Sequence, residues 1–307
     1  MAPEDALRTL PLLPEDPAPT RQPKQGNAGD LNDLSGTEWI KLTKSWFICD
    51  SHRGRKNKDT ELHPARYPEE MVQQFLQFFT KRDAWVLDPF CGSGATLVSC
   101  LENDRRGIGV ELSPRYAEVA SKRLARLDGE RRVAVIEGDA RRLAEPEMWA
   151  GAPGPQRGED GLPGFDFVMT SPPYWDMLQH SRGGVESTHK LRGKKNLDTT
   201  YSESDRDLAN VADYDEFIEQ LGRVFDGCAC LLNPGKYLVC VVQNCRTKDK
   251  EVKPLAWDLA RRISRTLSFQ GERIWCQDSK RLGIWGFPKV FVPNYHHHYC
   301  LIFQKRT

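Results

Sequence analysis

The sequence predicts an α/β fold built on an open, mostly parallel sheet, and two patterns support this expectation. Short apolar runs at 85–87, 107–110 and 133–136 each end next to a glycine or an acidic residue, as strands do where an α/β sheet meets its ligand. Helical patterns at 95–103 and 114–127 follow the first two runs. Strands that alternate with helices in this way are typical of a doubly wound sheet, in which helices cover both faces.

The remainder of the chain continues this pattern. Further strands are expected from Phe165 to the prolines at 172 and 173, and at 237–242, 273–276 and 299–303. Further helices are expected at 71–79, 214–225 and 254–267, where apolar residues recur at helical spacing.

Composition narrows the class of protein. We expect one large domain over 30–307, after a disordered tail at 1–29 that is rich in proline and polar residues. The formal net charge of +1 gives no global attraction to nucleic acid, so any such contact must come from local basic segments. The chain has no run of about 18 apolar residues and no secretory signal. Its nine scattered cysteines indicate reduced thiols, so we expect a cytoplasmic protein.

The first three strands predict a crevice for a cofactor. A glycine-rich turn, Asp88–Gly94, follows the first strand, and its glycines allow the backbone to approach a ligand closely. Glu111 ends the second strand, 23 residues after Asp88, where an acidic residue accepts hydrogen bonds from ribose hydroxyls. Asp139 follows the third strand and is placed to meet an adenine amino group. A plain βαβ core without a ligand is the alternative interpretation.

A second turn, in the stretch FDFVMTSPPYW at Phe165–Trp175, predicts the reacting site. Pro172 and Pro173 end the strand, because proline cannot donate to the ladder and fixes its own φ. A serine hydroxyl, the Pro172 carbonyl and the ring of Tyr174 then project from the turn. Together these groups suit the binding of a planar base by its exocyclic amine. The alternative is a Pro-Pro turn in which Tyr174 only packs.

Neither the cysteines nor the three adjacent histidines at 296–298 predict a metal site. The cysteines lack the paired spacing of zinc sites. Neighbouring residues in a strand point to opposite faces, so three histidines in a row cannot all bind one ion.

The two turns together resemble the amino-methyltransferases of DNA that use S-adenosyl-L-methionine, the N4-cytosine and N6-adenine family. The turn DPFCGSG resembles the cofactor motif of that family, and TSPPY at Thr170–Tyr174 resembles its catalytic motif. His63, in a His-Pro pair, is similar to the element beside the methionine end of the cofactor. The resemblance covers roughly residues 30–307. It implies the class I S-adenosylmethionine-dependent methyltransferase fold, which has a seven-stranded, mostly parallel sheet.

The resemblance also implies roles for particular residues. The implied cofactor-binding residues are His63, Asp88, Pro89, Phe90, Gly92, Gly94, Glu111 and Asp139. The implied catalytic residues are Ser171, Pro172, Pro173 and Tyr174. Serine at the first position of the catalytic motif is typical of enzymes that methylate the N4 amine of cytosine. We therefore expect methylation of cytosine N4 in double-stranded DNA by in-line attack, with the base flipped out and stacked on Tyr174 or Trp175.

Three segments remain for target recognition, near 52–58, 178–212 and 277–298. Basic residues of the first two segments are expected to contact DNA phosphates: Arg53, Arg55, Lys56, Lys190, Arg192, Lys194 and Lys195. Adenine N6, a structured RNA, or a cofactor-sensing module without catalysis are the alternatives. A stand-alone enzyme and one with a partner restriction endonuclease fit the sequence equally well.

Overall fold

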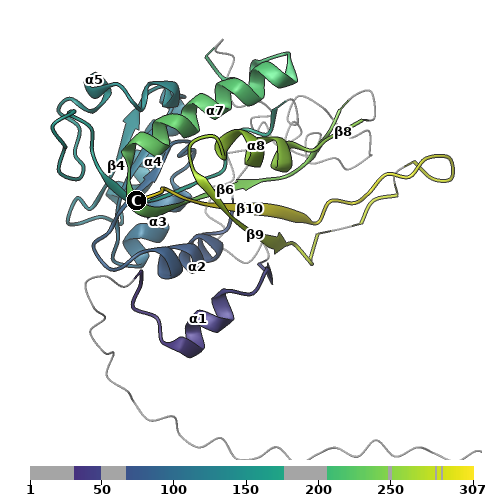
Figure 1. Ribbon diagram of the computed structural model, residues 1–307, viewed down its shortest axis with the longest axis horizontal. Coiled ribbons are helices and arrows are strands. Elements are labelled where there is room, and N and C mark those ends of the chain that lie inside the picture. The colour runs from purple at the N-terminus through teal and green to yellow at the C-terminus, as the bar shows by residue number, and fades with distance from the viewer. Residues whose placement is uncertain (1–30, 50–66, 176–205, 248–250, 281, 285) are drawn as a thin grey trace, which may run out of the picture.

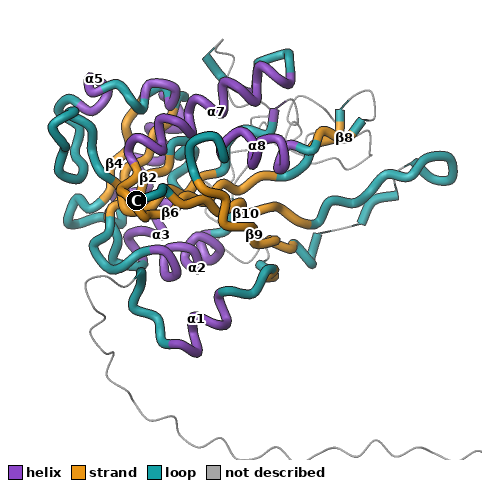
Figure 2. The backbone as a smooth tube through the Cα atoms, in the orientation of Figure 1, coloured by secondary structure: helices purple, strands orange, loops and turns teal. Residues whose placement is uncertain are grey.

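The computed structural model describes residues 31–49, 67–175, 206–247, 251–280, 282–284 and 286–307. They form a layered α/β body around a central sheet (Figure 1). Helices α7 (Tyr214–Leu231) and α8 (Leu255–Ile263) cover one face of the sheet, and α2 (Glu69–Phe79) covers the other. Figure 2 shows the strands running through the middle, with a long loop that extends beyond them at one end.

The central sheet has eight strands in the order β1-β9-β10-β6-β5-β2-β3-β4. Neighbours are parallel except around β10, which is antiparallel to both β9 and β6. The bounds are β1 Trp46–Ile48, β2 Trp85–Asp88, β3 Arg106–Glu111, β4 Val133–Glu137, β5 Phe165–Thr170, β6 Leu232–Val242, β9 Ser268–Cys276 and β10 His297–Gln304. Seven of these strands form the predicted sheet with its reversed last strand. The class I methyltransferase fold is therefore confirmed, and β1 is an addition at the edge.

The other elements are short and connect these strands. They are α1 Gly36–Leu42, α3 Ala95–Glu102, α4 Pro114–Ala125, α5 Pro146–Trp149, the 3-10 helices η2 Ala140–Arg142 and η4 Leu208–Asn210, and the hairpin strands β7 Cys245–Arg246 and β8 Val252–Lys253. The observed β9 and β10 are longer than predicted. They pair with each other from Ser268 and Gln304 to Cys276 and His297, beyond the apolar runs that a sequence pattern can detect.

Two apolar layers hold the helices on the sheet. The buried side chains of α7 against one face include Phe217, Leu221, Val224, Phe225 and Cys228. Those of α2 against the other face are Met71, Val72, Phe75, Leu76 and Phe79. Both sets recur at helical spacing, and burying each large side chain contributes roughly 1.5–3 kcal/mol. The two layers fix the strand ends on which the site is built.

The edge strand β1 was not predicted. It has only three residues and pairs in parallel with β9, with Phe47 opposite Trp275. Two side chains of β9 secure it: the Arg273 guanidinium donates to the Lys44 carbonyl at 3.0 Å, and the Trp275 indole donates to the Cys49 carbonyl at 2.6 Å. Three residues are too few to show an alternating pattern, so only the structure reveals this strand.

Candidate active site

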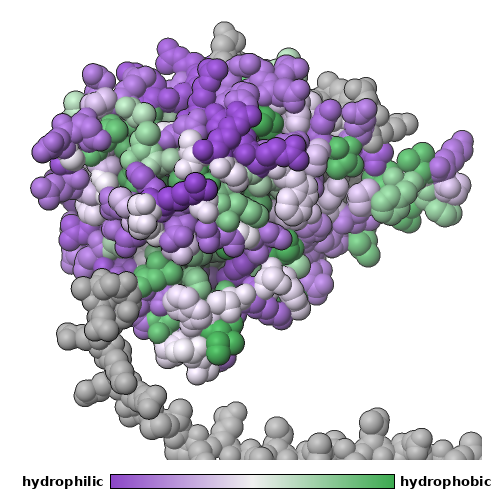
Figure 3. Space-filling view, in the orientation of Figure 1, coloured by the Kyte–Doolittle hydropathy of each residue, from purple (hydrophilic) through white to green (hydrophobic). Residues whose placement is uncertain are grey.

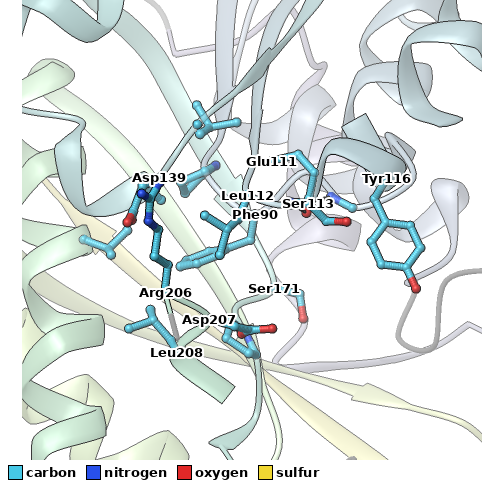
Figure 4. A pocket seen from close by; sticks show the side chains of 17 residues that line it. Phe90, Glu111, Leu112, Ser113, Tyr116, Asp139, Ser171, Arg206, Asp207 and Leu208 are labelled. Carbon is cyan, nitrogen blue, oxygen red and sulfur yellow. Dashed lines mark hydrogen bonds between the residues drawn. The ribbon is translucent and has the colours of Figure 1, made fainter. Parts of the chain in front are cut away.

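The carboxyl ends of β2, β3, β4 and β5 meet at one edge of the sheet, because the strands are parallel. A cleft opens there, lined by residues at or just after all four strand ends. Figure 4 shows Phe90 in its middle, with Asp139 and Arg206 to one side, Glu111 to the other and Ser171 below. The cleft therefore brings the predicted cofactor crevice and the predicted catalytic turn into one site.

The glycine-rich turn after β2 forms one wall of the cleft. Gly92 and Gly94 have φ values of +52° and +82°, a left-handed conformation that is costly for residues with a Cβ. The Cys91 amide donates to the Val110 carbonyl at 2.9 Å, which holds the turn against β3. Phe90 and Gly92 consequently line the cleft, and α3 begins directly after Gly94.

Glu111, at the end of β3, is half-buried and accepts hydrogen bonds from two backbone amides. One carboxylate oxygen accepts from the Gly92 amide at 2.8 Å, and the other accepts from the Ser113 amide at 2.9 Å. Burial raises the pKa of Glu111 from its usual 4.5 to about 7, although both hydrogen bonds act to lower it. Its carboxylate lines the cleft and offers acceptor lone pairs to hydroxyl groups.

Asp139, beyond the end of β4, forms an ion pair. The Arg141 guanidinium approaches its carboxylate to 2.6 Å, and the Arg141 amide donates to it at 3.0 Å. Burial alone would raise the pKa of Asp139, but the hydrogen bonds from Arg141 together lower it below the usual value. Asp139 is therefore an ionised acceptor at the cleft wall.

Asp88 lies beneath the cleft rather than in its lining. It is buried and binds three hydroxyls: Thr170 at 2.7 Å, Thr96 at 2.5 Å and Tyr67 at 3.1 Å. The Phe90 amide also donates to it, at 3.1 Å. Burial raises the pKa of Asp88, and these hydrogen bonds oppose the rise. Because Thr170 precedes the catalytic turn and Phe90 lies in the cofactor turn, this one carboxylate fixes both turns relative to each other.

Ser171 stands at the end of β5 with its hydroxyl 3.0 Å from the Tyr174 hydroxyl. The Tyr174 hydroxyl lies 3.2 Å from the Val241 carbonyl, to which it must donate because a carbonyl only accepts. A tyrosine has one hydroxyl proton, so the Ser171 hydroxyl donates to Tyr174 in turn. Both lone pairs of Ser171 Oγ are thereby left to accept hydrogen bonds.

Tyr174 differs from the expected projecting ring. Its side chain is only 6% exposed, and its ring packs 6.0 Å from that of His298. Trp175 is held by its indole, which donates to the Val211 carbonyl at 2.9 Å. The sequence pattern could not show this, because the groups that enclose Tyr174 come from β6 and β10.

The structure thus divides the residues singled out by sequence. Those that line the cleft are Pro89, Phe90, Gly92, Glu111, Asp139, Ser171 and Pro173. Those that lie beside or beneath it are Asp88, Gly94, Pro172 and Tyr174. Those outside the described residues are His63, Arg53, Arg55, Lys56, Lys190, Arg192, Lys194 and Lys195.

Several lining residues were not predicted, and they come from two places. Leu112, Ser113 and Tyr116 follow Glu111 directly, and the start of a helix after an acidic strand end was a usable signal for them. Arg206, Asp207 and Leu208 lie at the described end of the 178–212 segment, where the chain returns to the cleft. Asp207 caps the short helix η4 by accepting from the Ala209 amide at 2.9 Å. No local pattern marks this return.

Residues 19–122 match the N6/N4 DNA methylase family. Over this stretch, about a third of its length, the chain is similar to that family. The match confirms S-adenosyl-L-methionine as the expected methyl donor, and the cleft fits it through its two acceptors, Glu111 and Asp139, and its apolar wall at Phe90.

Curated relatives share short stretches with this chain. The type II methyltransferase M.BglI of Bacillus subtilis is 36% identical over 95 residues, which are 30% of this chain and 26% of that protein. The putative methylase YubD of Escherichia coli K12 is 42% identical over 24% of this chain and 32% of that protein. The orphan methyltransferase M.BamHII of Bacillus amyloliquefaciens is 34% identical over 26% and 30%. The matches thus span about a third or less of these relatives.

Solved structures give a weaker likeness. TrmN from Thermus thermophilus superposes with a TM-score of 0.44 at 14% identity, over 77% of this chain and 48% of that one. A putative DNA modification methylase of the same organism, TTHA0409, gives 0.32 at 24% identity, over 55% and 52%. TM-scores this low support no inference about activity. Within the described residues, no helix is both long and apolar enough to cross a membrane.

Proposed function

We propose that this protein methylates the exocyclic N4 amine of cytosine in double-stranded DNA, with S-adenosyl-L-methionine as methyl donor. The observation that carries the proposal is the position of Ser171 on the same cleft as Glu111 and Asp139. Ser171 therefore offers a neutral acceptor for the amine of a target base. Glu111 and Asp139, on the same cleft, offer acceptors for the ribose hydroxyls and the adenine amine of the cofactor. The proposal applies the family's chemistry to a chain that matches only part of its relatives.

Three residues would hold the cofactor. Glu111 would accept hydrogen bonds from ribose hydroxyls, Asp139 would accept from the adenine amine, and Phe90 would supply an apolar wall. When bound, S-adenosylmethionine supplies a methyl group on a sulfonium. His63, from the His-Pro pair, is proposed to lie at the methionine end.

The catalytic turn would prepare the target amine. The N4 nitrogen of cytosine is a weak nucleophile because its lone pair is conjugated with the ring. Hydrogen bonds from its two hydrogens to Ser171 Oγ and the Pro172 carbonyl would localise that lone pair on nitrogen. The Tyr174 hydroxyl supports this role, because it accepts a hydrogen bond from the Ser171 hydroxyl and leaves the serine lone pairs to the substrate. Much of the acceleration would come from positioning.

The target base must leave the duplex to reach this cleft, because its amine is paired in DNA. The basic residues of the 52–58 and 178–195 segments are proposed to grip phosphates. The family includes N6 as well as N4 methylation, and the serine of the motif is what favours N4 here. One relative is named a type II enzyme and another an orphan, so a restriction endonuclease partner remains one of two options.

The experiment combines purified protein, double-stranded DNA and methyl-labelled S-adenosylmethionine, followed by digestion to nucleosides and mass identification. The expected product is N4-methylcytosine. Ser171→Ala should lower the turnover number roughly 100-fold, because it removes an acceptor used in the transition state, while cofactor affinity stays unchanged. Ser99→Ala is a matched control, since its buried hydroxyl donates to the Glu69 carbonyl away from the cleft.

Two results would contradict the proposal. N6-methyladenine as product would show that Ser171 does not set the target base. Labelled RNA together with unlabelled DNA would move the substrate to another polymer.

A further inference from the structure

Between β9 and β10 the chain leaves the sheet as a projecting loop, residues 277–296, which we call the apolar arm (Figures 1 and 2). The described part of its tip exposes several large apolar side chains. Ile284 is 87% exposed and Phe291 86% exposed, and Leu282, Phe287 and Val290 are also exposed. Figure 3 shows them as a hydrophobic patch at one extremity of the molecule. Large contiguous apolar patches on a protein surface mark interaction sites.

Hydrogen bonds between the two limbs shape the arm. The Gln277 amide donates to the His296 carbonyl at 2.7 Å, and the Lys280 ammonium donates to the Tyr295 carbonyl at 2.8 Å. Nearer the tip, the Asn294 side chain binds both the amide and the carbonyl of Gly283 at 2.9 Å. At the tip, Gly286 has a φ of +72°, and a Cβ on it would meet the Val290 carbonyl oxygen at 2.1 Å. The arm is thus a formed structure that presents its apolar tip.

The arm starts at the same end of the sheet as the catalytic turn, where β5 also ends. β9 and β6 are both antiparallel to β10, so β9 runs parallel to β5 and ends at the same edge as Ser171. The base of the arm also touches the packing of that turn. The ring of His298, at the start of β10, lies 4.5 Å from Trp275 and 6.0 Å from Tyr174.

The charge of the arm indicates its partner. The arm, residues 277–296, contains Lys280, Arg281 and Lys289 and one acidic residue, Asp278, so it carries an excess of positive charge in a chain whose formal net charge is only +1. Two arms of this charge would repel each other in a symmetric dimer, whereas DNA phosphates attract them. Apolar side chains beside basic ones also suit DNA, because proteins that distort a duplex insert Phe, Leu or Ile between its bases.

We propose that the apolar arm is the wedge of the DNA interface, and that its tip packs against base faces of the duplex from which the target base is removed. Removing one base from the stack exposes apolar faces of its neighbours, which a hydrophobic tip can cover. The exposed Lys289 then faces the phosphates beside the unstacked site. This proposal rests on the proposed function, because it takes DNA as the substrate.

The test compares wild-type protein with the variant Ile284→Ser/Phe287→Ser/Phe291→Ser. The matched control is Leu127→Ser, which removes an apolar residue that is 53% exposed just after α4, at the opposite edge of the sheet. Duplex binding is followed by fluorescence anisotropy at several salt concentrations. Unstacking is followed with 2-aminopurine in the duplex, cofactor binding by calorimetry, and oligomeric state by sedimentation.

The arm variant is expected to bind duplex roughly tenfold more weakly, a loss of about 1.4 kcal/mol. The salt dependence of its binding should stay unchanged, because no charge is removed. The 2-aminopurine signal should fall, while cofactor affinity and the Leu127→Ser control match the wild type. Unchanged duplex binding would overturn the proposal. So would a change from dimer to monomer with intact duplex binding, which would assign the tip to a second copy of the chain.

These outcomes separate the two proposals. Wild-type protein that binds duplex through the arm but transfers no methyl group to it would contradict the proposed function alone. If the wild type methylates DNA and the arm variant binds and methylates the duplex equally well, the arm proposal alone is contradicted.

Discussion

The proposed cofactor side of the cleft and the proposed base side are built in different ways. Every cofactor-side residue singled out on the cleft lies between Pro89 and Asp139, on the ends of three consecutive strands. The base side combines Ser171 from β5, Val241 from β6, His298 from β10 and Leu208 from η4. The first side is thus assembled from neighbouring parts of the chain, and the second from distant ones.

This difference shows which parts of the site depend on the whole fold. The acids of the cofactor side hold partners within a few residues or on the adjacent turn, as Asp139 does with Arg141. The hydroxyl of Ser171 is oriented through Tyr174 by a carbonyl of another strand. Asp88 is hydrogen-bonded to both sides, through Phe90 and Thr170.

The largest effect is expected from Asp88→Ala, which breaks both sides together. The change leaves three buried hydroxyls and one amide without their acceptor, and each such group costs about 1–3 kcal/mol. We expect a loss of about 4 kcal/mol in the free energy of unfolding and at least roughly 100-fold in methyl transfer. Urea unfolding and the labelled-nucleoside assay measure the two losses.

Single-hydroxyl variants then separate the two sides. Thr96→Val should weaken cofactor binding more than turnover, and Thr170→Val should do the reverse, because Thr170 adjoins the catalytic turn. Thr80→Val is the matched control, since its buried hydroxyl binds Leu76 and Arg105 away from the cleft. Equal effects of the Thr96 and Thr170 variants on both quantities would show that Asp88 does not link distinct sides.

A smaller, pH-dependent effect is expected from Glu111 on the cofactor side. Its pKa is raised from 4.5 to about 7 in the folded protein. Between these values the folded state keeps a proton that the unfolded state has lost, so stability falls as pH rises from 4.5 to 7. The contribution amounts to roughly 3 kcal/mol and is constant above that range. Glu111→Gln should remove this slope, as measured by urea unfolding at about pH 5 and pH 8.

The affinity for the cofactor should also depend on the ionisation of Glu111, but it should rise with pH where the stability falls. Hydroxyl donors favour the ionised carboxylate, so wild-type affinity for S-adenosylmethionine should increase as pH rises through about 7. The Gln variant should show a flat profile in calorimetry over this range. A wild-type profile that is equally flat would exclude Glu111 as the acceptor for the ribose.

The smallest effect is expected from Tyr174→Phe on the base side. The variant keeps the packed ring but removes the hydroxyl that accepts from Ser171 and donates to Val241. We expect a loss of about 1 kcal/mol in stability and roughly fivefold in turnover, without change in cofactor affinity. Tyr299→Phe, which removes a hydroxyl that contacts His297, is the control. A larger loss of cofactor affinity than of turnover would place Tyr174 on the other side of the site.

The same contrast explains what the sequence could predict. Glu111 and Asp139 follow apolar runs directly, so a local pattern places them at strand ends, and the sheet brings them together. The burial of Tyr174 depends on β6 and β10, and the lining role of Arg206 depends on where a long segment returns. Neither leaves a trace in nearby residues. β1 escaped prediction because its three residues are too few to show an alternating pattern, and its partner strand lies more than 200 positions away.

That pairing of β1 with β9 has a consequence for the order in which the protein is made. Ribosomes release residues 46–48 long before residues 274–276, and chains are synthesised at about 5–20 residues per second. The first strand therefore waits on the order of ten seconds or more for its partner. During that time the exposed Trp46 and Ile48 have no sheet edge to join. The pair of β1 and β9 can form only when residues 274–276 have emerged.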